Sequence, residues 1–283
     1  MSDLHVYTAL WSMQPHDQTG IKLPYEEVVE KVADAGYRGM ALDFGATSRD
    51  DIERILPMMS KAGLRPFLVD FPKTVEALRP TLKLAKDHGA PFVVVIGQVM
   101  PVSVDGMIPV IRAWIAMSEE EGMPVLFETH RNCITNDLYT TLQLLDAIPE
   151  MRLCADLSHY VVGREMTLPI PDRELGHVSR ILARSDSFQG RVAGRQQVQL
   201  QLDFPQNQKW IDLFKGWWRE GFAGWRARTE DETCVFLCEL GPPDYAITGP
   251  DGRELSNRWD EALQIKGWVE EIWQTLDDEK PRS

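Results

Sequence analysis

Four strand-like runs between residues 124 and 239 each end in a side chain that carries an oxygen atom. The residues that close these runs are Glu128, Asp156, Gln189 and Glu239. One carboxylate at the end of an apolar run indicates little. Four such ends in successive repeats, where a barrel strand delivers its last inward side chain to the mouth, predict a metal site built by several strands.

Short strand-like runs alternate with longer segments of helical period along the whole chain. We expect eight strands, at 5–11, 37–43, 65–70, 91–97, 123–128, 151–156, 187–192 and 233–239. We expect eight helices, near 24–35, 48–62, 73–88, 103–121, 135–147, 172–184, 206–228 and 255–276. Glycine follows four of these helices, at Gly36, Gly63, Gly89 and Gly122. This pattern favours a single (β/α)8 barrel over an open doubly wound sheet.

No linker or charge block divides the 283 residues. We therefore expect one barrel over 1–276 and a solvated tail over 277–283. Side-chain alternation along the last strand gives Glu239 the same face as Leu237 and turns Cys234 and Cys238 toward the helices. The four cysteines form no CxxC pair, which predicts reduced core thiols.

The charge balance limits the kinds of partner. A formal charge of -13 and a pI near 5.0 oppose binding to nucleic acid or to an anionic membrane. No apolar run approaches the roughly 18 residues that span a bilayer, and the first five residues lack the features of a signal peptide. We expect a cytoplasmic protein with a small-molecule ligand and no nucleic-acid or membrane partner.

Four segments carry a family resemblance, namely FETHRN at 127–132, DLSHY at 156–160, FQGRV at 188–192 and CELG at 238–241. Through them nearly the whole chain resembles the sugar phosphate isomerase/epimerase barrels of the xylose isomerase-like superfamily. In ketose epimerases of that family, a glutamate, an aspartate, a histidine and a second glutamate hold one divalent metal ion. The resemblance places these ligands on Glu128, Asp156, Gln189 and Glu239. It also implies a substrate contact at His159 and matches the arginine of the seventh strand with Arg191.

Gln189 departs from the family pattern, because many relatives carry histidine there. Its amide oxygen can still bind a metal, so the site becomes entirely oxygen-based, with three carboxylates and one neutral ligand. That set favours Mn²⁺ or Mg²⁺ over Zn²⁺. Three carboxylates around one divalent ion leave about one unit of negative charge, which Arg191 or a protonated His159 would help to balance. Without a metal, at least one acid should stay protonated near neutral pH.

Several residues near the strand ends have two interpretations. His130 and Arg131 either face the substrate or cap the following helix. Trp11 either stacks on a sugar ring or packs the top of the barrel. Asp43 and Asp70 are expected to orient loops rather than to bind metal.

Structural roles also stay open for the main candidates. Glu128, Asp156 and Glu239 could have a purely structural role as ion-pair partners of Arg131 and Arg191. His159 could be a loop histidine whose ring nitrogens are hydrogen-bonded within the protein. An aromatic set with helical spacing indicates packing or a subunit interface, which leaves a homo-oligomer open. Its members are Trp210, Phe214, Trp217, Trp218 and Trp225.

The proposed site favours chemistry at a carbon next to a carbonyl. A dication bridging the carbonyl and hydroxyl oxygens would stabilise an enediolate. In the related epimerases two glutamates form the acid/base pair, which the resemblance assigns to Glu128 and Glu239. We expect an isomerase or epimerase acting on a non-phosphorylated ketose, because no glycine-rich phosphate cradle is present.

Two alternatives to this activity remain, along with one that the sequence disfavours. One is elimination from a 3-keto-glycoside, because the long segments 157–171, 193–206 and 240–254 could enclose a substrate larger than a monosaccharide. A non-catalytic sugar-binding barrel would suit the change at Gln189. The DNA-repair endonucleases of the superfamily use a His-rich zinc site, whereas this acidic chain has six histidines in all.

Overall fold

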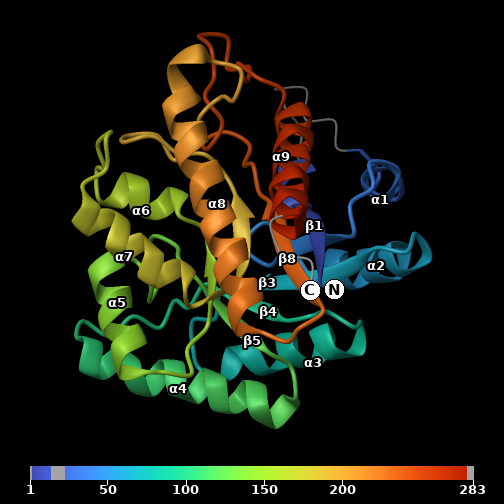
Figure 1. Cartoon of the computed structure of the whole chain (residues 1–283). Helices are drawn as coiled ribbons and strands as arrows, with labels where there is room; N and C mark the ends of the chain where they lie inside the picture. The colour runs from blue at the N-terminus through green and yellow to red at the C-terminus, as the bar shows by residue number, and fades with distance from the viewer. Residues whose placement is uncertain (1, 14–22, 279–283) are drawn as a thin grey trace.

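Within residues 2–13 and 23–278, which this computed structural model describes, eight short parallel strands close into one barrel (Figure 1). They are β1 (Asp3–Ala9), β2 (Gly39–Asp43), β3 (Arg65–Asp70), β4 (Val93–Val95), β5 (Val125–Glu128), β6 (Leu153–Ala155), β7 (Ser185–Gly190) and β8 (Thr233–Cys238). The barrel closes between β8 and β1, from Asp3 opposite Thr233 to Thr8 opposite Cys238. The expected (β/α)8 architecture is confirmed.

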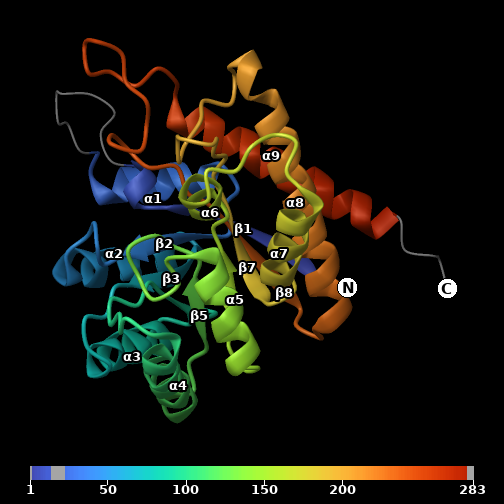
Figure 2. The ribbon, with the colours of Figure 1, turned by 90° about the vertical axis from the view of Figure 1, so that its left-hand side faces the viewer.

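Helices surround the strands in the order that the sequence predicts (Figure 2). The α-helices of the described residues are α1 (Tyr25–Asp34), α2 (Arg49–Lys61), α3 (Arg79–Asp87), α4 (Val104–Glu121), α5 (Leu138–Ala147), α6 (Ser158–Gly163), α7 (Asp172–Leu182), α8 (Gln208–Arg228) and α9 (Arg258–Asp278). Short 3-10 helices occur at η1 (Trp11–Met13), η2 (Glu76–Leu78) and η3 (Pro205–Asn207). The helix ends follow the glycine signals; Gly122 after α4, for example, has a left-handed φ of 64°.

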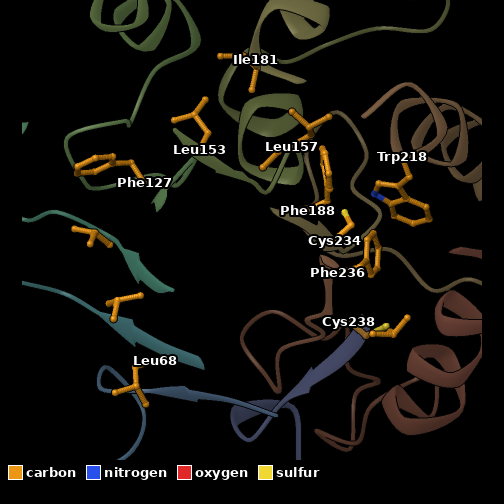
Figure 3. Packing of buried hydrophobic residues seen from close by; sticks show 14 of the residues in the cluster. Leu68, Phe127, Leu153, Leu157, Ile181, Phe188, Trp218, Cys234, Phe236 and Cys238 are labelled. Carbon is orange, nitrogen blue, oxygen red and sulfur yellow. The ribbon is translucent and has the colours of Figure 1, made fainter. Parts of the chain in front are cut away.

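Alternation along β8 separates the barrel interior from the helical shell, as expected. Val235 and Leu237 are buried in the interior cluster of the strands. The side chains that point outward are Cys234, Phe236 and Cys238. Figure 3 shows this outer layer, in which Phe236 meets Trp218 of α8 with ring centroids 5.4 Å apart. Glu239 follows Leu237 by two residues, so the alternation turns its side chain toward the interior of the barrel as well.

The aromatic face of α8 packs inside the molecule. Phe214, Trp217, Trp218 and Trp225 are all buried, whereas Trp210 is half-buried. The packing interpretation therefore holds for these four aromatic residues. All four cysteines are buried and free, as predicted.

Several boundaries differ from the sequence-based expectation; β7, for example, was expected at 187–192 and spans Ser185–Gly190. Strand β1 ends at Ala9, so Trp11 begins η1 instead of closing the strand. The short helix α6 follows β6 directly and has only six residues, too few to show a helical period. Helix α9 continues through Asp277 and Asp278, which the sequence assigned to the tail. The rest of that tail, 279–283, lies outside the described residues.

None of the helices in the described part of the chain is both long and apolar enough to span a bilayer.

Candidate metal and substrate site

Four polar side chains from four strands meet at the carboxyl end of the barrel. Glu128 is the last residue of β5, Gln189 lies in β7, and Glu239 directly follows β8. Asp156 directly follows β6. All four are buried. One carboxylate oxygen from each of the three acids lies within 4.8 Å of the other two. The structure thus brings together the four residues that the sequence selected.

The amide of Gln189 has a fixed direction. Its Nε2 donates a hydrogen bond of 2.8 Å to Oε2 of Glu128. This contact leaves Gln189 Oε1 without a hydrogen-bond partner, although the residue is only 1% exposed. A buried amide oxygen without a donor is costly, so it indicates a ligand.

The two carboxylate oxygens of Asp156 have different surroundings. Asp156 Oδ1 accepts a hydrogen bond of 2.9 Å from the backbone N–H of Ser158 at the start of α6. Asp156 Oδ2 has no hydrogen-bond donor. It lies 3.4 Å from Arg191 Nη2 and 3.4 Å from His159 Nε2. One carboxylate oxygen therefore holds the loop, and the other faces the site.

Arg191 supplies a positive charge inside the acidic group. Its Nε donates a hydrogen bond of 3.0 Å to the backbone carbonyl of Glu239, and its Nη2 forms an ion pair with the Glu239 carboxylate. The guanidinium is 1% exposed, and its Nη1 has no partner. Because buried charges need a counter-charge, Arg191 offsets part of the negative charge of the acids.

Burial and mutual repulsion shift the two glutamates toward their protonated forms. Burial, then the charges of Glu239 and Asp156, raise the pKa of Glu128 well above its usual range. Burial also raises the pKa of Glu239 to about 7, although Arg191 opposes this shift. At least one of these acids is then protonated near neutral pH when no metal is bound, as the sequence led us to expect.

Two histidines lie beside the acids. Burial lowers the pKa of His159 well below its usual value and lowers the pKa of His130 to about 4. Their ring centroids are 4.0 Å apart. Both imidazoles are therefore neutral near pH 7, so the protonated His159 considered as a counter-charge is not supported, and Arg191 takes that role.

An aromatic side chain that sequence reasoning missed stands at the mouth. Tyr245 packs edge-on against Trp11 with centroids 4.9 Å apart. The guanidinium carbons of Arg191 and Arg131 lie 4.7 Å and 5.0 Å from its ring centroid. Arg131 therefore stacks on an aromatic ring. The only sequence signal for Tyr245 was its position in the long segment after Glu239.

The segment that carries Tyr245 is fixed at its start. Gln199 donates a hydrogen bond of 3.0 Å to the Gly241 carbonyl and accepts one of 2.7 Å from the Gly241 N–H. A Cβ atom on Gly241 would lie 2.3 Å from the Trp11 ring. Glycine is needed there because the indole packs directly against the backbone. The pair of hydrogen bonds joins two long segments of the mouth.

The chemistry of the donor set fits a divalent metal ion. Three buried carboxylates converge, Gln189 Oε1 is a buried oxygen without a hydrogen-bond partner, and hard dications such as Mg²⁺ and Mn²⁺ prefer oxygen ligands. Asp156 Oδ2 is a second buried oxygen without a donor. These residues could therefore hold such an ion.

Comparisons with known proteins agree with this architecture. A model of the xylose isomerase-like TIM barrel family matches residues 29–184, more than half of the chain. A search of curated proteins found no match. A solved structure of L-ribulose 3-epimerase is 13% identical, with a TM-score of 0.62 over 100% of this chain and 99% of its own.

Two further solved structures share the fold. A xylose isomerase-like TIM barrel protein from Mycobacterium smegmatis, in complex with magnesium, is 11% identical, with a TM-score of 0.61 over 95% of this chain and 97% of its own. D-psicose 3-epimerase from Clostridium cellulolyticum H10, with D-tagatose, is 11% identical, with a TM-score of 0.60 over 95% and 99%. With the family model matched over more than half of its length, the chain belongs to the xylose isomerase-like TIM barrel family.

Proposed function

We propose that this protein is a divalent-metal-dependent sugar isomerase or epimerase that removes a proton from a carbon next to a carbonyl, acting on a non-phosphorylated ketose. The observation that carries the proposal is the convergence of three buried carboxylates, from Glu128, Asp156 and Glu239, at the barrel mouth. The family supports it, as do the structural neighbours, among them an L-ribulose 3-epimerase and a D-psicose 3-epimerase.

Mn²⁺ or Mg²⁺ suits the site better than Zn²⁺, because all the donor atoms are oxygens. The proposed ligands are Glu128, Asp156, Gln189 and Glu239. When bound, the ion supplies stabilisation for the negative charge that develops on the substrate oxygen as the C–H proton leaves.

Glu128 and Glu239 are the proposed acid/base pair. In the metal-free protein, burial and neighbouring charge raise the pKa values of both glutamates above the usual range, and a bound ion would lower them again. Arg191 holds Glu239 through its carboxylate and its backbone carbonyl, so this glutamate cannot swing freely. One glutamate takes the proton from the substrate carbon, and the other returns a proton on the opposite face.

Substrate contacts are proposed for the residues around the acids. His130 and His159 are neutral and offer ring nitrogens to sugar hydroxyl groups. Trp11 stands with Tyr245 at the mouth, where an aromatic wall can pack on a sugar ring. Arg131 and Arg191 flank that wall and can donate hydrogen bonds to substrate oxygens.

The test is a panel of free ketoses and 3-keto-glycosides incubated with Mn²⁺ in deuterated water and followed by NMR. We expect exchange of the α-hydrogen and appearance of an epimer or an aldose. Glu128→Gln and Glu239→Gln should each reduce turnover by a factor on the order of hundreds or more. Asp70→Asn, at a half-buried acid that also ends a strand, is the control and should retain most of the turnover.

The same panel separates the alternatives. Release of an aglycone without any epimer or aldose would replace the proposal with elimination, for which the long segments of the mouth give room. Inertness toward every sugar, together with measurable sugar binding, would favour a non-catalytic binding barrel.

A further inference from the structure

The residues of the candidate site lie beneath the surface of the barrel mouth. Their exposed fractions run from 0% for Asp156 to 7% for Glu239. Several of their polar atoms are buried without a hydrogen-bond partner, namely Asp156 Oδ2, Gln189 Oε1, Arg191 Nη1 and both ring nitrogens of His159. A sugar cannot touch atoms that have almost no exposed surface, so part of the mouth must move before a substrate binds.

Two side chains stand between these atoms and the solvent. Tyr245 is half-buried and Arg131 is exposed, whereas Arg191 is buried. The guanidinium carbons of Arg191 and Arg131 lie 4.7 Å and 5.0 Å from the ring centroid of Tyr245. The ring also stands edge-on to the buried His159, with centroids 6.5 Å apart. Tyr245 and Arg131 therefore form an outer layer over Arg191 and His159.

This outer layer is held more weakly than the rim beside it. Among the described residues, no side-chain hydrogen bond or ion pair holds Tyr245 or Arg131, and their mutual contact is a cation over a ring. Such a contact is worth only about 0.5–1 kcal/mol at an exposed site. In the rim, by contrast, the Ser12 carbonyl accepts a hydrogen bond of 2.7 Å from Arg258, and Ser12 Oγ accepts one of 3.2 Å from the Leu240 N–H. Movement is therefore expected in the outer layer.

The chain that carries Tyr245 has a fixed point close to the ring. Gln199 holds both backbone groups of Gly241, four residues before Tyr245. Beyond that point the Tyr245 N–H bonds only a local group, the Pro242 carbonyl, at 2.8 Å. The ring can therefore swing outward while the backbone next to Glu239 keeps its place.

We propose that Tyr245, with Arg131 stacked on it, is a gate that covers the candidate site and swings outward to admit the substrate. The inference rests on the proposed function, because it takes the buried acids as the place where the substrate binds. Opening frees Arg191 Nη1 and the ring nitrogens of His159 for substrate oxygens. Closure over the bound sugar then excludes water from the acids. Tyr245 thereby decides which ligands reach the site.

The experiment measures access to His159 in the metal-free full chain, without relying on turnover. Diethyl pyrocarbonate, a reagent close to a monosaccharide in size, acylates imidazole nitrogens, and mass spectrometry of peptides gives a rate for each histidine. We expect His159 to react slowly in the wild type and about tenfold or more faster in Tyr245→Ala, because labelling of a buried group follows how often its cover opens. Tyr245→Phe keeps the ring and should match the wild type.

A second variant tests the other half of the gate. Arg131→Ala removes only the stacked cation and should speed the labelling of His159 by about twofold or more. Arg131 is exposed, so this replacement leaves the fold intact and keeps the test valid if Tyr245→Ala does not fold. Circular dichroism checks the fold of each variant.

The matched control removes a tyrosine elsewhere. Tyr139 is also half-buried and packs edge-on against a histidine, with its ring centroid 5.2 Å from that of His177. Tyr139→Ala should leave the labelling rate of His159 unchanged. His88 is exposed and lies before β4, at the opposite end of the barrel, so it is the internal reference for reagent activity.

The outcomes separate the gate from the proposed function. If His159 reacts at one rate in the wild type, Tyr245→Ala and Arg131→Ala, or if it reacts as fast as His88 in the wild type, the gate is wrong while the proposed function stands. If the two variants expose His159 but the ketose panel shows neither turnover nor binding, the proposed function fails and the gate stands.

Discussion

Carboxylates close strands in both halves of the barrel, but their oxygens are used differently. In the first half, Asp43 Oδ1 accepts a hydrogen bond of 2.5 Å from the Gly45 N–H, and Asp70 Oδ1 accepts one of 2.7 Å from the Phe71 N–H. In the second half, Glu128 and Glu239 turn toward other side chains of the site. Acids of the first kind orient the loop that follows them, whereas acids of the second kind form a shared site.

The difference shows that a carboxylate at a strand end is not sufficient for a site. Asp156 combines both uses, since one oxygen accepts the Ser158 N–H and the other faces the site without a donor. What marks the second half is the presence of buried oxygens that no local N–H satisfies.

The largest effect is expected at Arg191. Arg191→Met removes the guanidinium that pairs with Glu239 and Asp156, and leaves buried carboxylates uncompensated. We expect the free energy of unfolding of the metal-free protein to fall by about 3–5 kcal/mol. Urea unfolding with and without Mn²⁺ measures it, and Mn²⁺ should recover part of the loss. An unchanged midpoint would show that the acids do not need this counter-charge.

The next effect separates the two kinds of acid by metal affinity. Asp156→Asn should weaken Mn²⁺ binding by about 100-fold or more, because it removes one negative ligand from the site. Asp70→Asn is the matched control and should change the affinity less than about threefold. Calorimetric titration of both variants provides the comparison, and equal losses of affinity would remove the distinction between the two halves.

A buried acid outside the mouth extends the comparison to pH. Burial raises the pKa of Glu261 to about 7, and its Oε1 accepts a hydrogen bond of 2.7 Å from the Leu202 N–H. Because the folded-state pKa is raised, the stability that the neutral acid gives is full below about pH 4 and is lost as the pH rises through about 7.

Glu261→Gln imitates the neutral acid at every pH. The stability of the variant relative to the wild type should therefore rise by about 1–2 kcal/mol between pH 4.5 and pH 8. Urea unfolding of both proteins at the two pH values measures the change. A difference that stays constant, or that falls with pH, would contradict the raised pKa.

The smallest effect is expected at Asp43. Asp43→Asn keeps an oxygen that can accept the Gly45 N–H, so the free energy of unfolding should fall by no more than about 1 kcal/mol. Mn²⁺ affinity should stay within about threefold of the wild type. A large loss of Mn²⁺ affinity would place Asp43 among the acids of the site instead of the loop acids.

Most strand positions could be predicted from sequence because most strands are short and largely apolar; β7, with the sequence SDSFQG, is an exception. The convergence of Glu128, Asp156, Gln189 and Glu239 followed from the rule that barrel strands present their last inward side chains to one mouth. The short helix α6 was missed because six residues carry no periodic signal.

Contacts between distant parts of the chain were beyond sequence reasoning. The hydrogen bond from Gln189 to Glu128 joins residues 61 positions apart, and no local pattern predicts that the amide nitrogen faces the carboxylate. Tyr245 was missed because it lies in an irregular segment whose path depends on tertiary contacts. Roles for these residues follow only from their positions in space.

The two hydrogen bonds between Gln199 and Gly241 have a consequence for the engineering of this barrel. The Gln199 side chain bonds both the N–H and the carbonyl of a residue 42 positions away. It therefore joins two loops in the way that a pair of backbone hydrogen bonds joins two neighbouring strands. Exchanging the 240–254 loop alone would leave the Gln199 amide buried and unpaired. The two loops should therefore be transplanted together, as one cassette, when this protein serves as a scaffold for new specificities.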